Sequence, residues 1–381
     1  MRIIIAPDSY KGSVSAAEVA DAIEKGFLKV FPEAEIIKIP IADGGEGTVQ
    51  ALVRATKGTL LPETVKGPLG EPLRAHWGIL GDGKTAIIEM AAASGLPLVP
   101  VERRNPLVTC SYGTGQLIKA ALDRGLRRII VGIGGSATND GGAGMARALG
   151  ARFLDAGGKE LPPGGAALRH LSAIDLRDLD PRLEESEVIV ACDVDNPLYG
   201  PRGASAVFGP QKAASPEMVE ELDAALRVFA DVARKVTGRD VSDQSGAGAA
   251  GGLGAGLMWF AGAILRPGVE IVLEVTGFES NVSACDLVVT GEGKTDFQTA
   301  FGKAPVGVAK VAQRHNKPVI CLSGGLGKGA EEVLRHGIDC VMSVVPGPMN
   351  LEECMARGAE LIEEAAARVA CLLKCGMKLG G

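Results

Sequence analysis

The chain has 381 residues, of which 46% are hydrophobic, and a formal net charge of −6. This length predicts about two domains, and the small, interspersed charge gives no reason to expect binding to nucleic acid or to a membrane surface. Its eight cysteines form no CxxC pair and no zinc pattern, and no apolar run reaches the roughly 18 residues of a membrane span. The first residues differ from a signal peptide, so we expect a cytoplasmic protein with reduced thiols.

Strand and helix patterns alternate at both ends of the chain. A β-branched run at 2–6 precedes a helical pattern at 15–31, and a strand pattern at 35–41 precedes a helix at 48–56. Near the other end, strand patterns at 285–290, 318–322 and 340–345 are separated by helical stretches. The alternation predicts one doubly wound, parallel α/β sheet built from both chain ends.

The middle of the chain has a different pattern. Strands broken by Gly and Pro at 64–78 and 85–90 predict hairpins, and mixed helices and strands follow them. The apolar stretch 253–265 predicts a buried helix. We therefore expect a domain of residues 1–62 and 283–381, interrupted by a second, mixed α/β domain of residues 63–282.

Two glycine motifs imitate nucleotide-binding signatures. Residues 78–85 match a P-loop letter for letter, but a β-prone segment follows and Asp82-Gly83 is a strong turn signal, so we interpret the motif as a hairpin turn. Residues 246–251 match a short dinucleotide pattern without a preceding strand, and the interpretation is a tightly packed helix entrance.

The glycine-rich segment 132–144 directly follows a predicted strand. Its first residues, with Asp155 about 20 residues further on, resemble a dinucleotide fingerprint, so a dehydrogenase is one alternative. A long polar loop delays the helix, however, and successive backbone N–H groups of glycines favour a phosphate cradle. In a purely structural alternative, Asp140 caps a helix and the glycines allow close packing.

Four acidic loops also follow predicted strands, where ligands of doubly wound sheets bind. Asp193 and Asp195 alternate, so both would point to one face if the strand continued, which suits Mg2+, and the nearby Arg202 and Lys212 offer cations. Helix caps, turns and solvated loops remain the alternatives for each loop taken separately. The acidic residues of the four loops are Asp8, Asp43, Glu46, Asp193, Asp195, Glu292 and Asp296.

The motifs at 6–13, 42–48, 132–144, 192–200 and 290–296 together resemble those of the type I glycerate kinase family, over essentially the whole chain. The resemblance implies a Rossmann-like domain interrupted by a second α/β domain. It also implies ATP- and Mg2+-dependent phosphorylation of D-glycerate, usually at the 2-hydroxyl. A glycerate 3-kinase, an NAD(P)-dependent dehydrogenase and a non-catalytic sugar-acid sensor stay open as alternatives, as do a monomer and a homodimer.

Individual roles within this pattern are hypotheses. We expect Asp193 to be the base or a metal ligand, with Asp8 as its rival, Asp195 as a second metal ligand and Lys11 on the substrate carboxylate. The expected substrate-binding residues are Ser9, Asp43, Gly44, Gly45, Glu46, Glu292 and Asp296. The expected nucleotide-binding residues are Gly134, Gly135, Ser136, Thr138, Asn139, Asp140, Gly141 and Gly142.

Overall fold

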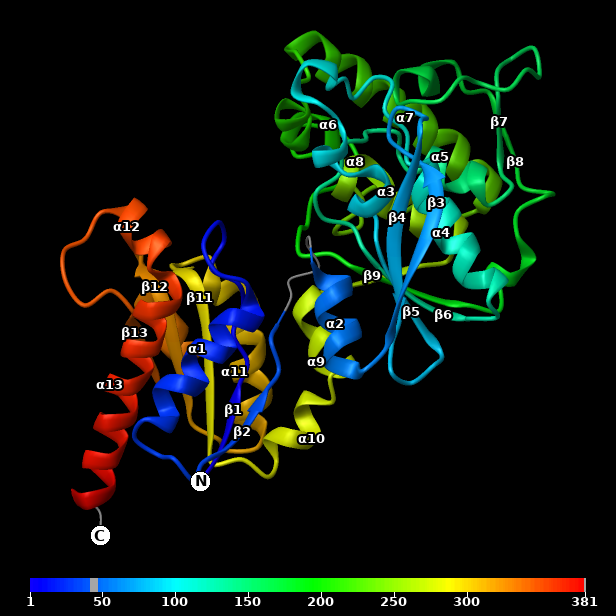
Figure 1. Cartoon of the computed structure of the whole chain (residues 1–381). Coiled ribbons are helices and arrows are strands. Elements are labelled where there is room, and N and C mark those ends of the chain that lie inside the picture. The colour runs from blue at the N-terminus through cyan, green and yellow to red at the C-terminus, as the bar shows by residue number, and fades with distance from the viewer. Residues whose placement is uncertain (42–46, 380–381) are drawn as a thin grey trace. The chain divides into compact units, whose positions relative to one another are not determined.

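The computed structural model describes residues 1–41 and 47–379 (Figure 1). The chain divides into two compact units, Met1–Asp43 with Val269–Gly381, and Gly44–Gly268. In this division residues 47–62 belong to the inserted unit and residues 269–282 to the first unit, whereas the sequence patterns suggested crossings near residues 62 and 282. The difference arises because α2 (Thr48–Thr56) packs on the sheet of the inserted unit, whereas Val269 packs against Gly307 of the first unit.

The first unit contains a sheet of five strands in the order β13-β12-β11-β1-β2, counted over the described residues. All neighbouring strands are parallel. Numbered within the unit, this order is 2-1-3-4-5, the flavodoxin-type form of the doubly wound class, so the predicted fold class is confirmed. The direction in which the chain adds strands to the sheet reverses between β1 and β11, and the carboxyl ends of these two parallel strands at this switch point are the expected ligand-binding position.

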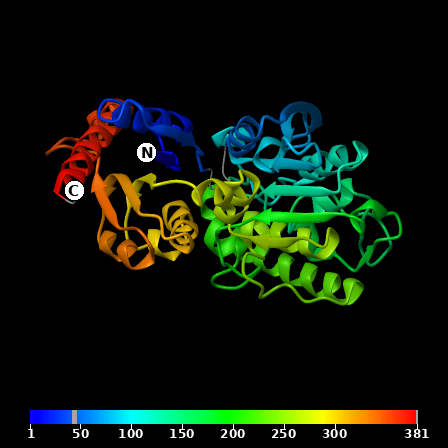
Figure 2. The ribbon, with the colours of Figure 1, turned by 90° about the horizontal axis from the view of Figure 1, so that it is seen from below.

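Helices cover both faces of this sheet. Figure 2 shows α1 and α13 together on one side and the gold helix α11 on the other. Apolar side chains of α1 and α13 share a core with alternate residues of β1, including Ile3 and Ile5. Ser15 begins α1 with a capping box, because its hydroxyl accepts from the Glu18 N–H and the Glu18 carboxylate accepts from the Ser15 N–H.

The strands and helices of the first unit are short and regular. Two 3-10 turns, Thr299–Phe301 and Ala330–His336, follow β11 and β12. The strands are β1 (Arg2–Ile5), β2 (Glu35–Lys38), β11 (Leu287–Thr295), β12 (Val319–Leu326) and β13 (Cys340–Ser343). The helices are α1 (Ala16–Leu28), α10 (Phe278–Val282), α11 (Ala304–Arg314), α12 (Leu351–Ala356) and α13 (Gly358–Leu379), with α9 (Gly268–Val275) starting at the crossing.

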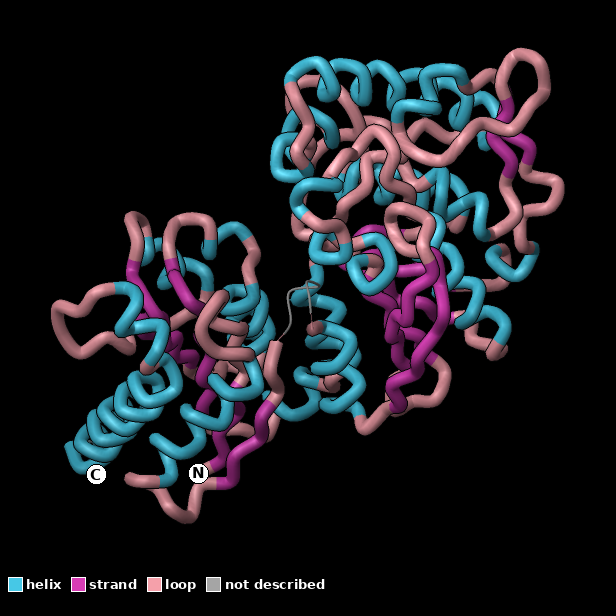
Figure 3. The backbone as a smooth tube through the Cα atoms, turned by 45° about the horizontal axis from the view of Figure 1, so that its top comes forward, coloured by secondary structure: helices cyan, strands magenta, loops and turns pink. Residues whose placement is uncertain are grey.

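The second unit contains a six-stranded sheet in the order β10-β9-β6-β5-β4-β3, drawn in magenta in Figure 3. β3, β4 and β5 form an antiparallel meander, and β5, β6, β9 and β10 are parallel. The P-loop look-alike forms the turn between β4 and β5. There the Asp82 carboxylate accepts from the N–H groups of Lys84 and Thr85, both at 2.9 Å, and Lys84 is exposed, as predicted for a hairpin turn.

Two layers of apolar side chains build the second unit. α4 and α8 pack on one face of the sheet, whose residues there include Ile88 and Val131, whereas α2 packs on β4 and β5. A second core lies between α5, α7, α8 and the small β7–β8 hairpin. It contains a cluster of aromatic rings with centroids 5.4–6.4 Å apart, formed by Phe153, Phe229, Trp259 and Phe260.

The remaining elements of the second unit complete these layers. Its further strands are β3 (Thr59–Lys66), β4 (Pro72–Ile79), β5 (Thr85–Glu89), β6 (Arg128–Gly132), β7 (Arg152–Leu154), β8 (Ala173–Asp175), β9 (Glu187–Ala191) and β10 (Ile264–Arg266). Its helices are α3 (Ala91–Ser94), α4 (Tyr112–Asp123), α5 (Ala143–Ala148), α6 (Ala204–Phe208), α7 (Pro216–Thr237) and α8 (Ala249–Phe260). Over residues 1–41 and 47–379, no helix is both long and apolar enough to cross a membrane.

The contact between α1 and α13 yields a stability prediction. A Cβ atom at Gly26 would collide with the Glu363 carbonyl and lie 2.6 Å from Ala366 Cβ. Gly26→Val should therefore lower the free energy of unfolding by about 1–3 kcal/mol, through overpacking. Gly376→Ala, also on a helix but with nothing within 4 Å of the added Cβ, should leave stability unchanged or raise it by up to about 1 kcal/mol.

Urea unfolding followed by circular dichroism measures both effects. A Gly26→Val protein that is as stable as the parent would show that the two helices can separate without cost.

Candidate functional site

The carboxyl ends of four parallel strands meet at one edge of the second unit's sheet. In register across this edge, Glu89 lies beside Gly132, Gly132 beside Ala191, and Ala191 beside Arg266. The loops that follow β6 and β9 therefore leave the sheet from neighbouring positions. These loops carry the predicted phosphate cradle and the predicted base or metal ligand, Asp193.

The exposed part of the glycine-rich loop consists of two residues, Gly134 and Gly135. Gly135 has a φ of +74°, in the left-handed region that favours glycine. Its carbonyl accepts from the Leu96 N–H at 2.8 Å, so the turn is anchored to the segment after β5. Backbone N–H groups in such a turn can face a bound anion, and the exposed turn is suited to phosphate oxygens.

The other predicted nucleotide-binding residues of this loop lie inside the unit. Asp140 is 1% exposed, and its carboxylate accepts from Ser111 N and Oγ, at 2.8 and 2.9 Å, and from the N–H groups of Gly142 and Gly144, at 3.2 and 3.1 Å. It thereby satisfies N–H groups at the starts of α4 and α5, as in the helix-cap alternative. The residues that are buried with Asp140 are Ser136, Thr138, Asn139, Gly141 and Gly142.

Of the eight residues predicted to bind the nucleotide, Gly134 and Gly135 are therefore the two that are exposed. All eight residues were predicted to bind the ligand, because the sequence of a polar, glycine-rich loop does not show whether its donors face solvent or the core.

In the dehydrogenase alternative, Asp155 would be the acidic residue that binds the ribose, and its surroundings do not support this role. The helix after the loop, α5, begins only at Ala143, and Asp155 lies in the turn that follows β7. The Asp155 carboxylate accepts from the N–H groups of Gly157 and Lys159, at 2.8 and 2.9 Å, so it stabilises its own turn. The geometry is that of a turn and gives no support to ribose recognition.

The two aspartates after β9 have different partners. The Asp193 carboxylate accepts from the Gly268 N–H at 2.9 Å, at the start of α9, and Asp195 forms an exposed ion pair with Arg202 at 2.9 Å. β9 ends at Ala191, so the strand alternation expected to place both carboxylates on one face does not extend to them. Among the described residues, no three His, Cys, Asp or Glu side chains are grouped to hold a metal ion.

The chemistry of this donor set nevertheless fits Mg2+. This ion takes oxygen ligands and is usually bound by one or two carboxylates together with substrate phosphates. Asp193 and Asp195 supply such carboxylate oxygens, in the loop that leaves the sheet next to the loop of the exposed Gly134–Gly135 turn.

Glu89 is a residue of this edge that sequence reasoning missed. It ends β5, is 6% exposed, and its Oε1 accepts from the Val49 N–H in the first turn of α2 at 2.7 Å. A buried carboxylate therefore engages one of the N–H donors at the N-terminus of α2. The signal in the sequence is a lone Glu closing an otherwise apolar strand.

A second set of predicted residues lies at the switch point of the first unit, where β1 and β11 are neighbours. The Asp8 N–H donates to the Gly291 carbonyl at 2.8 Å, which sets Asp8 beside β11. The Asp8 carboxylate accepts from the Ser9 N–H at 2.6 Å and from the Ser9 hydroxyl at 3.3 Å. Lys11 follows in an exposed turn.

Glu292 was expected in a loop but lies within a strand. β11 continues to Thr295 because its glycine-rich end pairs with β12, with Glu292 beside Ser323. Glu292 is 6% exposed, and its Oε1 accepts from the hydroxyls of Thr295 and Thr299, at 3.0 and 2.6 Å. Burial raises the pKa of the Glu292 carboxyl above its usual value.

Asp296, the next predicted acidic residue, is flanked by cations. The Nζ atoms of Lys294 and Lys303 lie 3.5 and 4.0 Å from its carboxylate. The structure thus brings Asp8, Glu292 and Asp296 to the carboxyl ends of neighbouring strands, β1 and β11. Asp43, Gly44, Gly45 and Glu46, predicted to bind substrate, lie outside the described residues.

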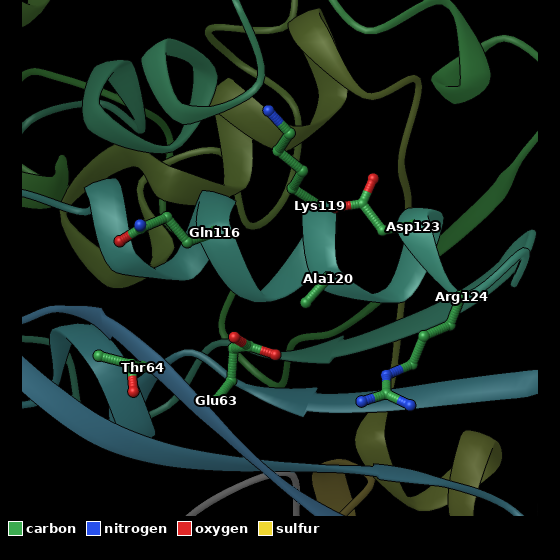
Figure 4. Close-up of a pocket in the computed structure, with 7 residues that line it drawn as sticks. All are labelled: Glu63, Thr64, Gln116, Lys119, Ala120, Asp123 and Arg124. Atoms are coloured by element: carbon green, nitrogen blue, oxygen red, sulfur yellow. The ribbon is translucent and has the colours of Figure 1, made fainter.

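A separate surface pocket of about 360 Å³ lies beside β3 in the second unit. Figure 4 shows Glu63 and Thr64 on β3 next to α4, which carries Gln116, Lys119, Ala120 and Asp123, with Arg124 directly after it. None of the residues predicted to bind substrate, nucleotide or metal lines this pocket, so it gives no support to the predicted chemistry.

The buried Glu292 predicts a pH dependence of stability. Because its folded-state pKa is raised above 4.5, the folded protein binds this proton more tightly than the unfolded chain, and stability falls as the pH rises above that value. Glu292→Gln removes the titration and retains an acceptor for both threonines. The variant should therefore gain stability relative to the parent between about pH 4.5 and pH 7.

Urea unfolding at both ends of this pH range measures the change. Glu331→Gln, at an exposed position of the same unit, is the matched control. A stability difference between Glu292→Gln and the parent that is independent of pH would contradict the prediction.

Comparison with known proteins identifies the family of this chain. Residues 3–374 match the glycerate kinase family. The chain is 56% identical to a glycerate kinase of Bacillus subtilis (strain 168), over 98% of each chain, and 54% identical to a glycerate 2-kinase of Escherichia coli (strain K12), over 100% of each. It resembles the crystal structure of a putative glycerate kinase 2 from Salmonella typhimurium LT2, with a TM-score of 0.89, 52% identity and 99% of each chain covered. The chain therefore belongs to the glycerate kinase family.

Proposed function

We propose that this protein transfers the terminal phosphoryl group of ATP to the 2-hydroxyl of D-glycerate, giving 2-phosphoglycerate and ADP. The observation that carries this proposal is the 54% identity, over the full length of both chains, to a protein named glycerate 2-kinase. Phosphoryl transfer depends mainly on positioning and on electrostatic stabilisation of the phosphates, and the residues at the carboxyl edges suit both tasks.

ATP phosphates are proposed to bind at the exposed Gly134–Gly135 turn. The positive φ of Gly135 and the bond from Leu96 to its carbonyl favour a fixed turn whose backbone N–H groups receive an anion. Because the formal charge is −6, the chain as a whole does not attract phosphate, and the site that binds it must be local.

Asp193 is the proposed hydroxyl-orienting base or Mg2+ ligand. Its bond to the Gly268 N–H fixes the orientation of the carboxylate. Bound Mg2+ would neutralise charge on the phosphates, held by Asp193 together with phosphate oxygens. Asp195 is proposed in second place, because Arg202 already pairs with its carboxylate.

The switch-point residues of the first unit are proposed to bind a polar ligand of the same reaction. Lys11 and Lys303 are cations suited to a carboxylate or phosphate, whereas Asp8, Ser9 and Glu292 are suited to hydroxyl groups. The proposed part of Gly44 and Gly45 in holding glycerate concerns residues outside the described ranges.

Product identification tests the function directly. After incubation with ATP, Mg2+ and D-glycerate, phosphorus NMR should show 2-phosphoglycerate and ADP accumulating in equal amounts. The signal of 3-phosphoglycerate instead would retain the kinase and change the hydroxyl, and the absence of any phosphorylated product would contradict the proposal.

The role of Asp193 is tested by Asp193→Asn, which keeps a side-chain oxygen for the Gly268 N–H and so should preserve the fold. Loss of the carboxylate charge should lower kcat by about 10²–10⁴-fold, with a much smaller change in the ATP KM. Asp195→Asn is the matched variant and should lower kcat by a smaller factor. Near-normal turnover by folded Asp193→Asn would reject the role.

A further inference from the structure

A lysine lies buried against the glycine-rich loop that carries the proposed phosphate turn. Lys212 ends a 3-10 turn (Pro210–Lys212) and is 1% exposed. Its side chain points inward, and its Nζ donates to the Thr138 carbonyl at 2.6 Å. Sequence reasoning placed this cation near Asp193, whereas the structure places it against the glycine-rich loop.

Burying this amine is unfavourable. Desolvation lowers the pKa of Lys212 to about 7, although the negative charge of Asp140 opposes the shift. A methionine would fill a similar volume without a buried charge, and such replacements of buried charges are often neutral or stabilising. Packing alone therefore does not account for a lysine at this position.

The Thr138 carbonyl is fixed from two directions. Lys212 donates to it, and the backbone of Gly251 lies so close that a Cβ there would collide with the same oxygen. Gly251 has a φ of +68° within a non-helical start of α8, which lets its backbone approach. Because the peptide unit is planar and trans, fixing this carbonyl also fixes the direction of the Asn139 N–H.

The other side of the turn is fixed as well. The Ala137 N–H donates to the Ser94 carbonyl at 2.9 Å, and the Thr109 hydroxyl donates to the Ala137 carbonyl at 2.8 Å. With the bond from Leu96 to Gly135, these contacts hold residues 135–137, and Lys212 holds residue 138. The exposed Gly134–Gly135 turn is thus supported by a chain segment that cannot shift independently.

In the described part of the chain, the amine of Lys212 donates to a backbone carbonyl and to no carboxylate. Its neighbour Asp140 accepts instead from Ser111, Gly142 and Gly144. Thr138 Oγ1 and Asn139 Oδ1 are buried without a hydrogen-bond partner among the described residues.

We propose that Lys212 is a positioning residue for the nucleotide phosphates, holding the Thr138 peptide of the loop that carries the Gly134–Gly135 turn. The proposal rests on the proposed binding of ATP phosphates at this turn. It distinguishes Lys212 from a packing residue, because the effect of its removal depends on the phosphates of the ligand.

Calorimetric titration of Lys212→Met with Mg-ADP and with adenosine tests this inference. The Kd for ADP should rise about tenfold, whereas the Kd for adenosine should stay as in the parent. Lys235→Met, which removes an exposed lysine on α7, controls for the loss of one charge and should change neither value. Lys212→Arg, which keeps a long side chain with N–H donors for the Thr138 carbonyl, should restore part of the ADP affinity.

An unchanged ADP affinity in folded Lys212→Met, or an equal loss for ADP and adenosine, would overturn the inference. If circular dichroism shows that Lys212→Met does not fold, the Kd values for ADP and for adenosine are measured on Lys212→Gln instead and compared with those of the parent. Gly135→Val separates the inference from the assignment of the turn. If Gly135→Val leaves ADP binding intact, the assignment of the turn itself is wrong; if only Gly135→Val weakens it, the role of Lys212 alone is rejected.

Discussion

The parallel register of the strands is the constraint on which the rest of the structure depends. In an antiparallel sheet, successive loops would leave from opposite edges, whereas in both units the loops after parallel strands leave from one edge. This register sets Asp8 beside β11 in one unit and sets the glycine-rich loop beside the loop of Asp193 in the other. Residues separated by more than fifty positions, and in the first unit by more than 280, thus become neighbours through backbone pairing.

Buried ionisable groups support these loops without reaching their exposed surface. Asp140 joins the starts of two helices, Glu89 joins a strand to a helix, and Lys212 holds a loop carbonyl. Each is costly to bury, and each is stabilised by bonds to backbone groups of another element. The second unit therefore combines an apolar core with a few polar connections that fix the direction of individual peptides.

More of the fold than of the candidate site could be predicted from the sequence. Alternation of strands and helices at both ends was sufficient for the doubly wound class, and Asp82-Gly83 was sufficient for the hairpin turn. The extension of β11 through Gly291 and Gly293 was missed, because glycines seldom favour strands and here pair with β12 while Tyr10 packs closely on them. The buried positions of Asp140 and Lys212 were missed for another reason: a sequence shows which polar residues follow a strand, but not which backbone donors and acceptors already occupy them.

The contact between the glycine-rich loop and α8 limits how this chain can evolve. Gly142 and Gly256 approach so closely that a Cβ on Gly142 would lie 3.1 Å from Gly256 Cα, and one on Gly252 would lie 2.9 Å from Gly141 Cα. Gly141, Gly142, Gly251 and Gly252 also have positive φ. Every missense change of a glycine codon adds at least one carbon atom, so these positions have no conservative neighbour in the genetic code. Variation that tunes the exposed turn must therefore arise elsewhere, in side chains around a backbone contact that itself cannot drift.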